Sequence, residues 1–308
     1  TAEVQPDGTT GINPIGLLEN GQKLALLSQV RSWVRGTHTE VRILPVIDLK
    51  RYRPDPQAIW NTRRTNPAWN RPSAKYSRNS SGGGHWEKCD VPQSWQIKYG
   101  ELSFNVKPMN FKHTGIFPEQ AANWDFAMDK IKSAGRPVSV LNLFAYTGGA
   151  TVACAKAGAS VCHVDAAKGM VSWAKENASS CGLQNAPIRW IVDDCIKFVD
   201  REIRRGKKYD AIIMDPPSYG RGPGGEVWKL EENLWDFVSL CAGVLSDDPL
   251  FVIINSYTTG LSPAVLTYIS ESIFTKKFGG GSESQELGLP VTESGLILPC
   301  GASCRWQA

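Results

Sequence analysis

From about residue 119 onward, apolar and polar positions alternate between two periodicities. Short apolar runs typical of buried strands are followed by stretches whose apolar positions recur at helical spacing. We expect strands over 139–144, 160–164, 189–192, 210–214 and 250–255, and helices over 119–133, 150–157, 166–180, 196–205 and 230–245. This alternation predicts an α/β fold with a doubly wound, mostly parallel sheet covered on both faces. The expected apolar face of the first helix is imperfect and consists of Ala122, Phe126, Met128 and Ile131.

The first part of the chain shows no such alternation. Residues 1–60 hold short apolar pieces at 24–27 and 41–49, which predict short strands separated by turns. Residues 61–85 are poor in aliphatic side chains and rich in Asn, Arg, Ser and Gly, so they predict a loop or linker.

Residues 95–107 alternate between apolar and polar side chains around Gly100-Glu101, as the two strands of a β-hairpin do. We expect a β-rich N-terminal region with a basic linker over 1–94, and a domain built on the parallel sheet over 95–308.

Composition and cysteine usage narrow the class of protein. With 308 residues, of which 42% are hydrophobic, the chain can bury a sizeable core and is not disordered throughout. No apolar run approaches the ~18 residues of a membrane helix, and a basic-then-apolar leader is not recognisable, so we expect a cytoplasmic protein. Eight cysteines are too few for a disulfide scaffold. Only Cys300 and Cys304 lie close together, which favours reduced, buried thiols over a metal site.

Positive charge is concentrated in the first part of the chain. Residues 1–113 carry 16 Lys and Arg against 9 Asp and Glu, whereas residues 114–308 carry 18 against 21. Between Lys50 and Arg78 the cations alternate with aromatic side chains, namely Trp60, Trp69 and Tyr76. This mixture suits phosphate neutralisation with base stacking and so favours an RNA partner, although a solvated basic loop would have the same composition.

Acidic and glycine residues stand at the ends of successive expected strands. The first strand runs into Thr147-Gly148-Gly149, which could let a ligand lie against the backbone or could simply form a tight turn. Asp165 ends the second strand, where an acid can bind a ribose diol or cap the next helix. Asp194, after the third strand, could accept from an adenine amine or cap its own helix.

The most specific segment follows the fourth strand and reads Asp215-Pro216-Pro217-Ser218-Tyr219. Two prolines directly after a buried strand fix a rigid turn and hold backbone carbonyls outward. An acid before them and an aromatic ring after them can bind a planar nucleobase, the acid by accepting a hydrogen bond and the ring by stacking. The glycine-rich residues 220–225 then predict either a mobile substrate flap with Arg221 in it or a simple loop.

These segments together resemble class I S-adenosylmethionine (SAM) methyltransferases, which have a Rossmann-like fold. More closely, they resemble the bacterial family that contains the large-subunit rRNA cytosine carbon-5 and guanine methyltransferases. The matching segments are 142–150, 163–165, 193–194 and 215–219. Residues 111–120 also resemble the family's Lys-Thr-Gly-Phe-Phe-Leu-Asp-Gln segment, which helps to cover the cofactor.

The resemblance implies SAM as the cofactor and assigns roles to single residues. It implies Gly148 near the methionine portion, Asp165 on the ribose, Asp194 on the adenine and Asp215 facing the methyl group. The other residues that it implies at the cofactor are Phe117, Gln120, Asn142, Phe144, Tyr146 and Thr147. On the substrate side it implies that Asp215, Pro216 and Tyr219 position the base.

Two departures from the family limit what the resemblance implies. Many members begin with a PUA RNA-binding domain, which is not recognisable in residues 1–94. The cytosine enzymes carry a cysteine after the fifth strand, whereas residues 254–259 here contain none. Cys195 follows the adenine-side acid and Cys241 lies in the middle of an expected helix, so carbon-5 methylation with a displaced cysteine is disfavoured.

We therefore expect a methyltransferase that acts on a nucleobase of RNA, with rRNA as the substrate class that the resemblance implies. Transfer from a sulfonium mainly requires an oriented and desolvated nucleophile, which suits a base nitrogen. A methyltransferase for a protein or a small molecule and a non-catalytic SAM-binding or RNA-binding protein stay open as alternatives. The oligomeric state also stays open.

Overall fold

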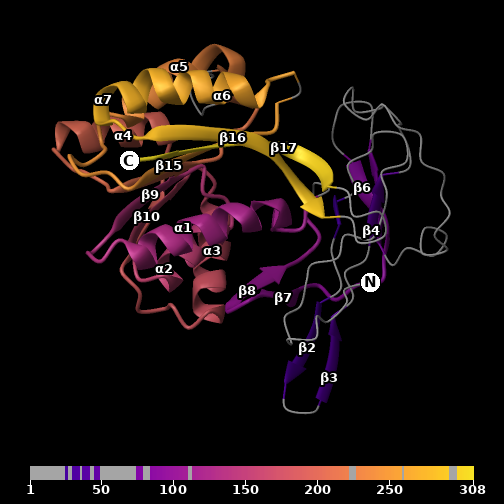
Figure 1. Cartoon of the computed structure of the whole chain (residues 1–308). Coiled ribbons are helices and arrows are strands. Elements are labelled where there is room, and N and C mark those ends of the chain that lie inside the picture. Colours follow the sequence, from indigo (N-terminus) through magenta and orange to yellow (C-terminus); the bar gives the residue numbers. More distant parts are fainter. Residues whose placement is uncertain are drawn as a thin grey trace. The chain divides into compact units, whose positions relative to one another are not determined.

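The structure is a computed structural model of the chain (Figure 1). It describes residues 25–26, 30–34, 37–41, 45–48, 74–78, 84–109, 113–221, 227–258, 260–290 and 297–308. The backbone forms two compact units, one of residues 1–118 and 289–298 and the other of residues 119–288 and 299–308. The domain boundary that the sequence predicts after residue 94 stays a prediction.

The described part of the first unit consists largely of β-strands. They are β1 (Ala25–Leu26), β2 (Val30–Val34), β3 (Thr37–Val41), β4 (Pro45–Asp48), β5 (Ala74–Arg78), β6 (Gly84–Cys89), β7 (Trp95–Tyr99) and β8 (Leu102–Val106). The order β1-β4-β5-β6 forms one sheet, while β2 pairs with β3 and β7 with β8. The antiparallel pair β7–β8 confirms the predicted hairpin, and Leu102 and Phe104 bury one face of it.

The prediction of a loop or linker over residues 61–85 is wrong for β5. This strand pairs in parallel with β4 and antiparallel with β6, so its backbone is hydrogen-bonded on both sides. Pairing of this kind satisfies the backbone regardless of how polar the side chains are, and composition alone does not reveal it. Residues 50–73, which hold most of the basic stretch, lie outside the described residues.

The second unit is built on a mostly parallel sheet, which confirms the predicted fold class. The strands of this sheet among the described residues are β9 (Ser139–Leu143), β10 (Ser160–Asp165), β11 (Ile188–Val192), β12 (Ala211–Met214), β15 (Phe251–Ser256), β16 (Gly281–Pro290) and β17 (Ile297–Gln307). Residues 289–290 of β16 and 297–298 of β17 are counted with the first unit. The strand order is β11-β10-β9-β12-β15-β17-β16, and β11 to β15 run parallel while β17 is antiparallel to β15. The chain order reverses between β9 and β12, where ligands of such sheets bind.

Helices cover both faces of this sheet (Figure 1). On one face lie α1 (Ala121–Ser133), α2 (Gly149–Lys156) and α3 (Lys168–Ser180). On the other face lie α4 (Cys195–Arg204), α5 (Leu230–Cys241) and α6 (Pro263–Ser270). The short elements η2 (Pro118–Gln120), β13 (Tyr219–Arg221), β14 (Val227–Lys229), η3 (Glu271–Thr275) and α7 (Lys276–Phe278) complete the described segments.

Side chains of alternate residues on the central strands belong to two separate hydrophobic cores, one on each face of the sheet. In β12, Ile212 and Met214 pack against α4 and α5, whereas Ala211 and Ile213 pack towards α1 and α2. Side chains of successive strand residues point to opposite faces, so a strand between two helical layers must be apolar throughout. This explains why the sequence of these strands shows continuous apolar runs.

Two helices differ from their predicted patterns. Helix α5 ends at Cys241 instead of 245, because Leu245 leaves the helix to bridge Tyr209. The predicted apolar face of α1 is only partly right. Ile131 is buried and Phe126 is partly buried against the core, but Ala122 is exposed, and Asn123, Trp124 and Ala127 are buried instead. Asn123 can be buried because its amide is hydrogen-bonded inside the protein to Asn255 and Ser303, which the periodicity of apolar residues alone does not indicate.

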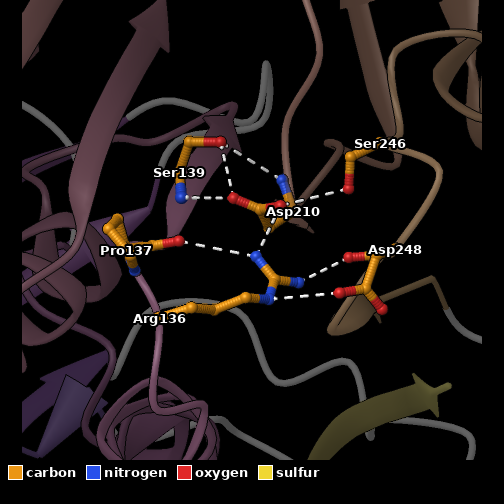
Figure 2. A network of polar contacts seen from close by, with 6 residues as sticks. All are labelled: Arg136, Pro137, Ser139, Asp210, Ser246 and Asp248. Atoms are coloured by element: carbon orange, nitrogen blue, oxygen red, sulfur yellow. Dashed lines mark hydrogen bonds and ion pairs between the residues drawn. The ribbon is translucent and has the colours of Figure 1, made fainter.

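A polar network ties the amino ends of β9 and β12 together (Figure 2). The Oδ2 atom of Asp210 accepts from the backbone N and the Oγ of Ser139, at 2.7 and 2.9 Å. Its Oδ1 accepts from Arg136 at 2.8 Å and from Ser246 at 3.1 Å, and Arg136 also pairs with Asp248. Burial acts to raise the pKa of Asp210, but these donors lower it below its usual value. The network is at the amino ends of the strands and is therefore structural.

Within the described part of the chain, we find no helix that is both long and apolar enough to cross a membrane.

Candidate functional site

The carboxyl ends of β9, β10 and β12 meet at one edge of the sheet. Leu143 of β9 is paired with Val164 of β10 on one side and with Met214 of β12 on the other. The loops that follow these strands therefore start side by side. They carry three of the sequence-predicted segments: the loop at Phe144–Gly148, the acid Asp165 and the acid Asp215.

The loop after β9 holds two non-glycine residues in the left-handed backbone region, Phe144 with φ 54° and Tyr146 with φ 50°. Such residues cost energy and persist only where neighbouring groups fix them, often at functional sites. Here the N–H of Phe144 donates to the Sγ of Cys195 at 3.3 Å, and the N–H of Tyr146 donates to the Oδ2 of Asp165 at 2.8 Å. The loop is thus held in one conformation by side chains from α4 and β10.

The two glycines after this loop allow close packing of the neighbouring helices. Gly148 caps α2 with φ 82°, and a Cβ added there would lie 2.8 Å from the Cβ of Ala174. This confirms the reading of a tight turn that requires glycine. A Cβ at Gly149 would lie 2.7 Å from the indole ring of Trp124, so the second glycine lets α1 approach α2. The position of Gly148 at the first turn of α2 still leaves helix N–H groups near the loop.

Asp165 does not cap a helix, which corrects one of the two interpretations of this residue. Helix α3 begins at Lys168 and its N-cap is Ala167, without a side-chain cap. The Oδ1 of Asp165 accepts from the N–H of Ala167 at 2.8 Å, while Oδ2 holds Tyr146. Burial raises the pKa of Asp165 above its usual value, and these two backbone donors act in the opposite direction. A half-buried carboxyl group at a strand end can accept further hydrogen bonds from a ligand.

The acids after β11 have separate roles. Asp194 caps α4, because its Oδ1 accepts from the N–H of Lys197 at 2.9 Å, which confirms the capping interpretation. Asp193 accepts from the N–H of Asp194 and pairs with Arg201. On either side of this acidic pair, Val192 and Ile196 are 50% and 41% exposed. Apolar side chains left exposed beside a carboxylate fit a planar, hydrogen-bonding ligand such as adenine.

Two of the predicted cofactor residues are buried and bonded within the protein. The amide of Asn142 donates to the Oγ1 of Thr151 at 2.8 Å, and the carbonyl of Thr147 accepts from the amide of Asn177 at 2.8 Å. Both side chains are buried. Phe117 belongs to the first unit, where its ring contacts that of His113.

Asp215 follows β12 directly and is partly buried, whereas Pro216 is buried and Tyr219 is 53% exposed. Burial, and after it the negative charge of Glu119, raise the pKa of Asp215 to about 7. A carboxyl group with a pKa near neutrality can change protonation during a reaction cycle, and such groups cluster at functional sites.

Two residues that sequence reasoning missed lie near Asp215, namely Glu119 and Tyr257. The hydroxyl of Tyr257 accepts from the amide of Gln120 at 2.8 Å, and Gln120 accepts in turn from Asn123 at 2.9 Å. Burial and the charges of Glu119 and Asp215 raise the pKa of Tyr257 well above its usual value. The sequence did offer one signal for Tyr257 as a site residue: it follows the fifth strand, just as Asp215 follows the fourth.

These features fit an adenosyl cofactor at the carboxyl edge of the sheet. A carboxylate with free acceptor capacity, a fixed loop ending at a helix N-terminus and exposed apolar side chains beside a second acid are the groups that an adenosine and its substituents require. Within the described residues, no group of three or more His, Cys, Asp and Glu side chains could hold a metal ion.

Comparison with known proteins also indicates a protein that binds an adenosyl cofactor. A family model described as S-adenosylmethionine-dependent methyltransferase matches residues 61–228. A SAM-dependent methyltransferase from Agrobacterium tumefaciens of known crystal structure is 31% identical, with a TM-score of 0.78, and the match covers 97% of this chain and 96% of that one. A candidate methyltransferase solved in complex with S-adenosylhomocysteine (SAH) is 22% identical, with a TM-score of 0.63 over 78% of this chain and 63% of that one, and so shares the fold.

Two curated relatives carry the name ribosomal RNA large subunit methyltransferase K/L. The protein from Shewanella frigidimarina is 32% identical over 165 residues, which are 53% of this chain and 21% of that protein. The protein from Syntrophotalea carbinolica is 26% identical over 186 residues, or 59% of this chain and 25% of that protein. The chain thus spans only about a fifth to a quarter of the length of these relatives. Because the family model matches more than half of it, and because a solved relative matches along nearly its whole length, the chain belongs to the family of S-adenosylmethionine-dependent methyltransferases.

Proposed function

We propose that this methyltransferase modifies a nucleobase of ribosomal RNA. The observation that carries the proposal is the position of Asp215-Pro216-Pro217 directly after β12, beside the fixed loop after β9. The names of the curated relatives support the substrate class. With an rRNA substrate, the partner of the protein is RNA. The reaction would take place in the cytoplasm, where ribosomes assemble. Residues 95–308 would form the catalytic domain, with 1–94 as an accessory region.

For the cofactor, we assign the ribose diol to Asp165 and the adenine to Asp194 with Val192 and Ile196. Asp194 uses Oδ1 as a helix cap, so Oδ2 would be the acceptor for the adenine amine. The backbone between Phe144 and Gly148 would face the methionine portion. When bound, SAM supplies a methyl group activated by the sulfonium charge.

For the substrate, we assign the base to Asp215, the Pro216 carbonyl and Tyr219. The carboxylate of Asp215 would accept from an N–H of the base, orient the nitrogen lone pair and offset the positive charge that develops on it. The exposed ring of Tyr219 would stack on the base. The Oγ of Ser218 accepts from Thr258 at 2.7 Å, which leaves its own hydroxyl hydrogen available to the substrate.

Cytosine carbon-5 methylation is a weaker alternative, since it needs a thiolate that adds to the ring. Cys195 and Cys241 are buried, and burial raises the pKa of both thiols above the usual value. Cys300 on β17 is partly exposed and is the thiol to test. Cys300→Ser should keep full activity if the acceptor is a nitrogen, and loss of activity in a folded variant would favour the carbon-5 reaction.

The proposal is tested by incubating the protein with methyl-labelled SAM and, in parallel, large-subunit rRNA, DNA or a mixture of ribosomal proteins. We expect label in rRNA, and nucleoside analysis should place it on a base nitrogen. Asp215→Ala is the negative control for each substrate. Label that appears only in protein or in a small molecule would contradict the proposal and support a methyltransferase for those substrates.

A further inference from the structure

We propose that Trp228 is a positioning residue that couples the loop carrying Asp215 to the loop after β9. The indole lies between these two loops, bonded to a carbonyl of the first and packed on an aromatic ring of the second. This inference rests on the proposed function, since it gives a role to the loop that would hold the base. Trp228 itself would not touch substrate or cofactor.

The first half of the coupling is a hydrogen bond to the proline turn. The Nε1 of Trp228 donates to the carbonyl of Pro217, with 2.6 Å between the two atoms. Neither Pro216 nor Pro217 has an N–H, so this part of the backbone can be held only through its carbonyls. One residue further on, the Ser218 carbonyl accepts from the N–H of Leu230 at 3.1 Å. Trp228 of β14 and Leu230, the first residue of α5, therefore fix the turn that follows Asp215.

The second half of the coupling is an aromatic cluster, defined here as Phe144, Trp228 and Phe237. Their ring centroids lie 5.8 Å apart for Phe144 and Trp228, 5.4 Å for Phe144 and Phe237, and 5.7 Å for Trp228 and Phe237. Edge-on and tilted pairs at these separations are favourable beyond the burial of their area. Phe144 is one of the residues with a left-handed backbone, so this packing helps to hold the loop after β9 in its strained conformation.

The hairpin of β13 and β14 explains how one side chain reaches both loops. Trp228 is paired with Gly220 in the antiparallel register, and Tyr219 is paired with Lys229. Successive residues of a strand point to opposite faces, so Trp228 can face Phe144 and Phe237 while the neighbouring pair faces outward. Tyr219 is 53% exposed on that outer face. A shift of Trp228 would therefore move Asp215 and Tyr219 together.

A positioning role predicts a specific pattern of kinetic defects. Trp228→Phe keeps a ring in the cluster and removes only the donor, and Trp228→Leu removes both. We expect single-turnover methyl transfer to fall about 10-fold in Trp228→Phe and further in Trp228→Leu, because a lost hydrogen bond and a misplaced base both cost rate. The Kd for SAM should stay within about twofold in Trp228→Phe, since phenylalanine keeps a ring packed against Phe144 and the loop after β9 is also held by Asp165 and Cys195.

Trp235→Phe is the matched control. Trp235 lies on the exposed side of α5, where it is 45% exposed and contacts Tyr268. This variant should transfer methyl at the wild-type rate and should have the same circular dichroism and Tm as Trp228→Phe. A wild-type transfer rate in Trp228→Phe would overturn the proposal. So would a parallel loss of SAM affinity and rate, which would indicate a general structural role.

A fluorescence measurement separates this inference from the proposed substrate, because it needs no RNA. Saturating SAH should change the tryptophan emission of the wild type and of Trp235→Phe, and the change should be absent in Trp228→Phe. An undiminished change in Trp228→Phe would show that the indole does not respond to the cofactor loop and would overturn the coupling. Failure of the wild type to methylate rRNA would contradict the proposed function. The fluorescence result would then still test whether Trp228 couples the two loops.

Discussion

Asp165 accepts a hydrogen bond from the backbone N–H of Tyr146, with 2.8 Å between Oδ2 and N. The acid that ends β10 therefore fixes the strained loop that follows β9. A carboxylate in this position can act twice, since it orders the backbone of the loop and would also accept from the ribose. The two functions depend on the same group, so they should be lost together.

Asp165→Ala is accordingly expected to weaken SAM binding. Hydrogen bonds to a charged acceptor contribute roughly 1.5–3 kcal/mol, so the Kd measured by calorimetry should rise by about tenfold or more. Asp200→Ala is a suitable control, because Asp200 lies on α4 in an exposed pair with Arg204. An unchanged Kd in Asp165→Ala would show that the ribose is bound elsewhere.

Asp215→Ala should separate binding from chemistry. The proposed contacts of SAM are to Asp165, Asp194 and the loop after β9, so its Kd should stay within a few-fold. Stabilisation of charge on the accepting nitrogen is stronger in the transition state than in the ground state, so its loss should lower the rate of methyl transfer. Single-turnover assays at saturating SAM measure this directly. A rate close to that of the wild type would remove Asp215 from the mechanism.

The pH dependence of kcat/KM should follow the ionisation of Asp215. Its pKa is raised to about 7 by burial and then by Glu119, and the ionised form is the one that accepts from the base. Activity should therefore rise with pH through about 7 and level off above it. Glu119→Gln removes the like charge, so the rising limb should move to lower pH. A limb that stays in place would show that burial alone sets the pKa.

Much of the fold was predictable, because buried strands and amphipathic helices leave strong patterns. The strands β9, β10, β11, β12 and β15 lie within a residue or so of their predicted bounds. The pattern failed where pairing or polar contacts override composition. Strand β5 is polar in sequence yet paired on both sides, and Asn123 is buried because partners from β15 and β17 satisfy its amide.

The acids at the strand ends of the candidate site could be predicted from the sequence. The residues that surround these acids could be predicted less well. Position after a parallel strand places Asp165 and Asp215 at one edge of the sheet. The proximity of Glu119 to Asp215 depends on how α1 meets the sheet, and the contact of Trp228 with Pro217 depends on a hairpin of three-residue strands. Contacts of this kind follow from tertiary packing, so a single sequence does not indicate them.

Arg136→Ala should lower stability and leave methyl transfer unchanged. Arg136 and Asp210 are both largely shielded from water, and the pair joins β9, β12 and the turn at Asp248 (Figure 2). Removing one partner leaves polar atoms without donors, so the free energy of unfolding should fall by about 1–3 kcal/mol, measured by urea denaturation. The lowered pKa of Asp210 means that its contribution is present above the usual carboxyl pKa and is lost in acid. The difference between wild type and variant should therefore shrink as the pH falls towards 3.

RNA affinity should depend steeply on salt if the basic stretch between Lys50 and Arg78 contacts phosphates. Each contact to a single strand releases counterions and adds ~0.7 to the slope of log K against log salt concentration. The double variant Arg63→Ala, Arg64→Ala should therefore flatten that slope by more than one unit in filter-binding or anisotropy measurements.

The control removes the same amount of charge from the amino ends of the parallel strands in the second unit. Lys156 is the last residue of α2, and Lys207 lies in the turn after α4. Both are exposed, and the C-terminal ends of these helices lie at the amino ends of the parallel strands. Lys156→Ala, Lys207→Ala should leave the slope unchanged, because RNA bound at the carboxyl ends would not reach them. An equal change in both double variants would show that overall charge, and not the basic stretch, sets the affinity. Affinity that is independent of salt in the wild type would contradict an RNA substrate and favour a small molecule.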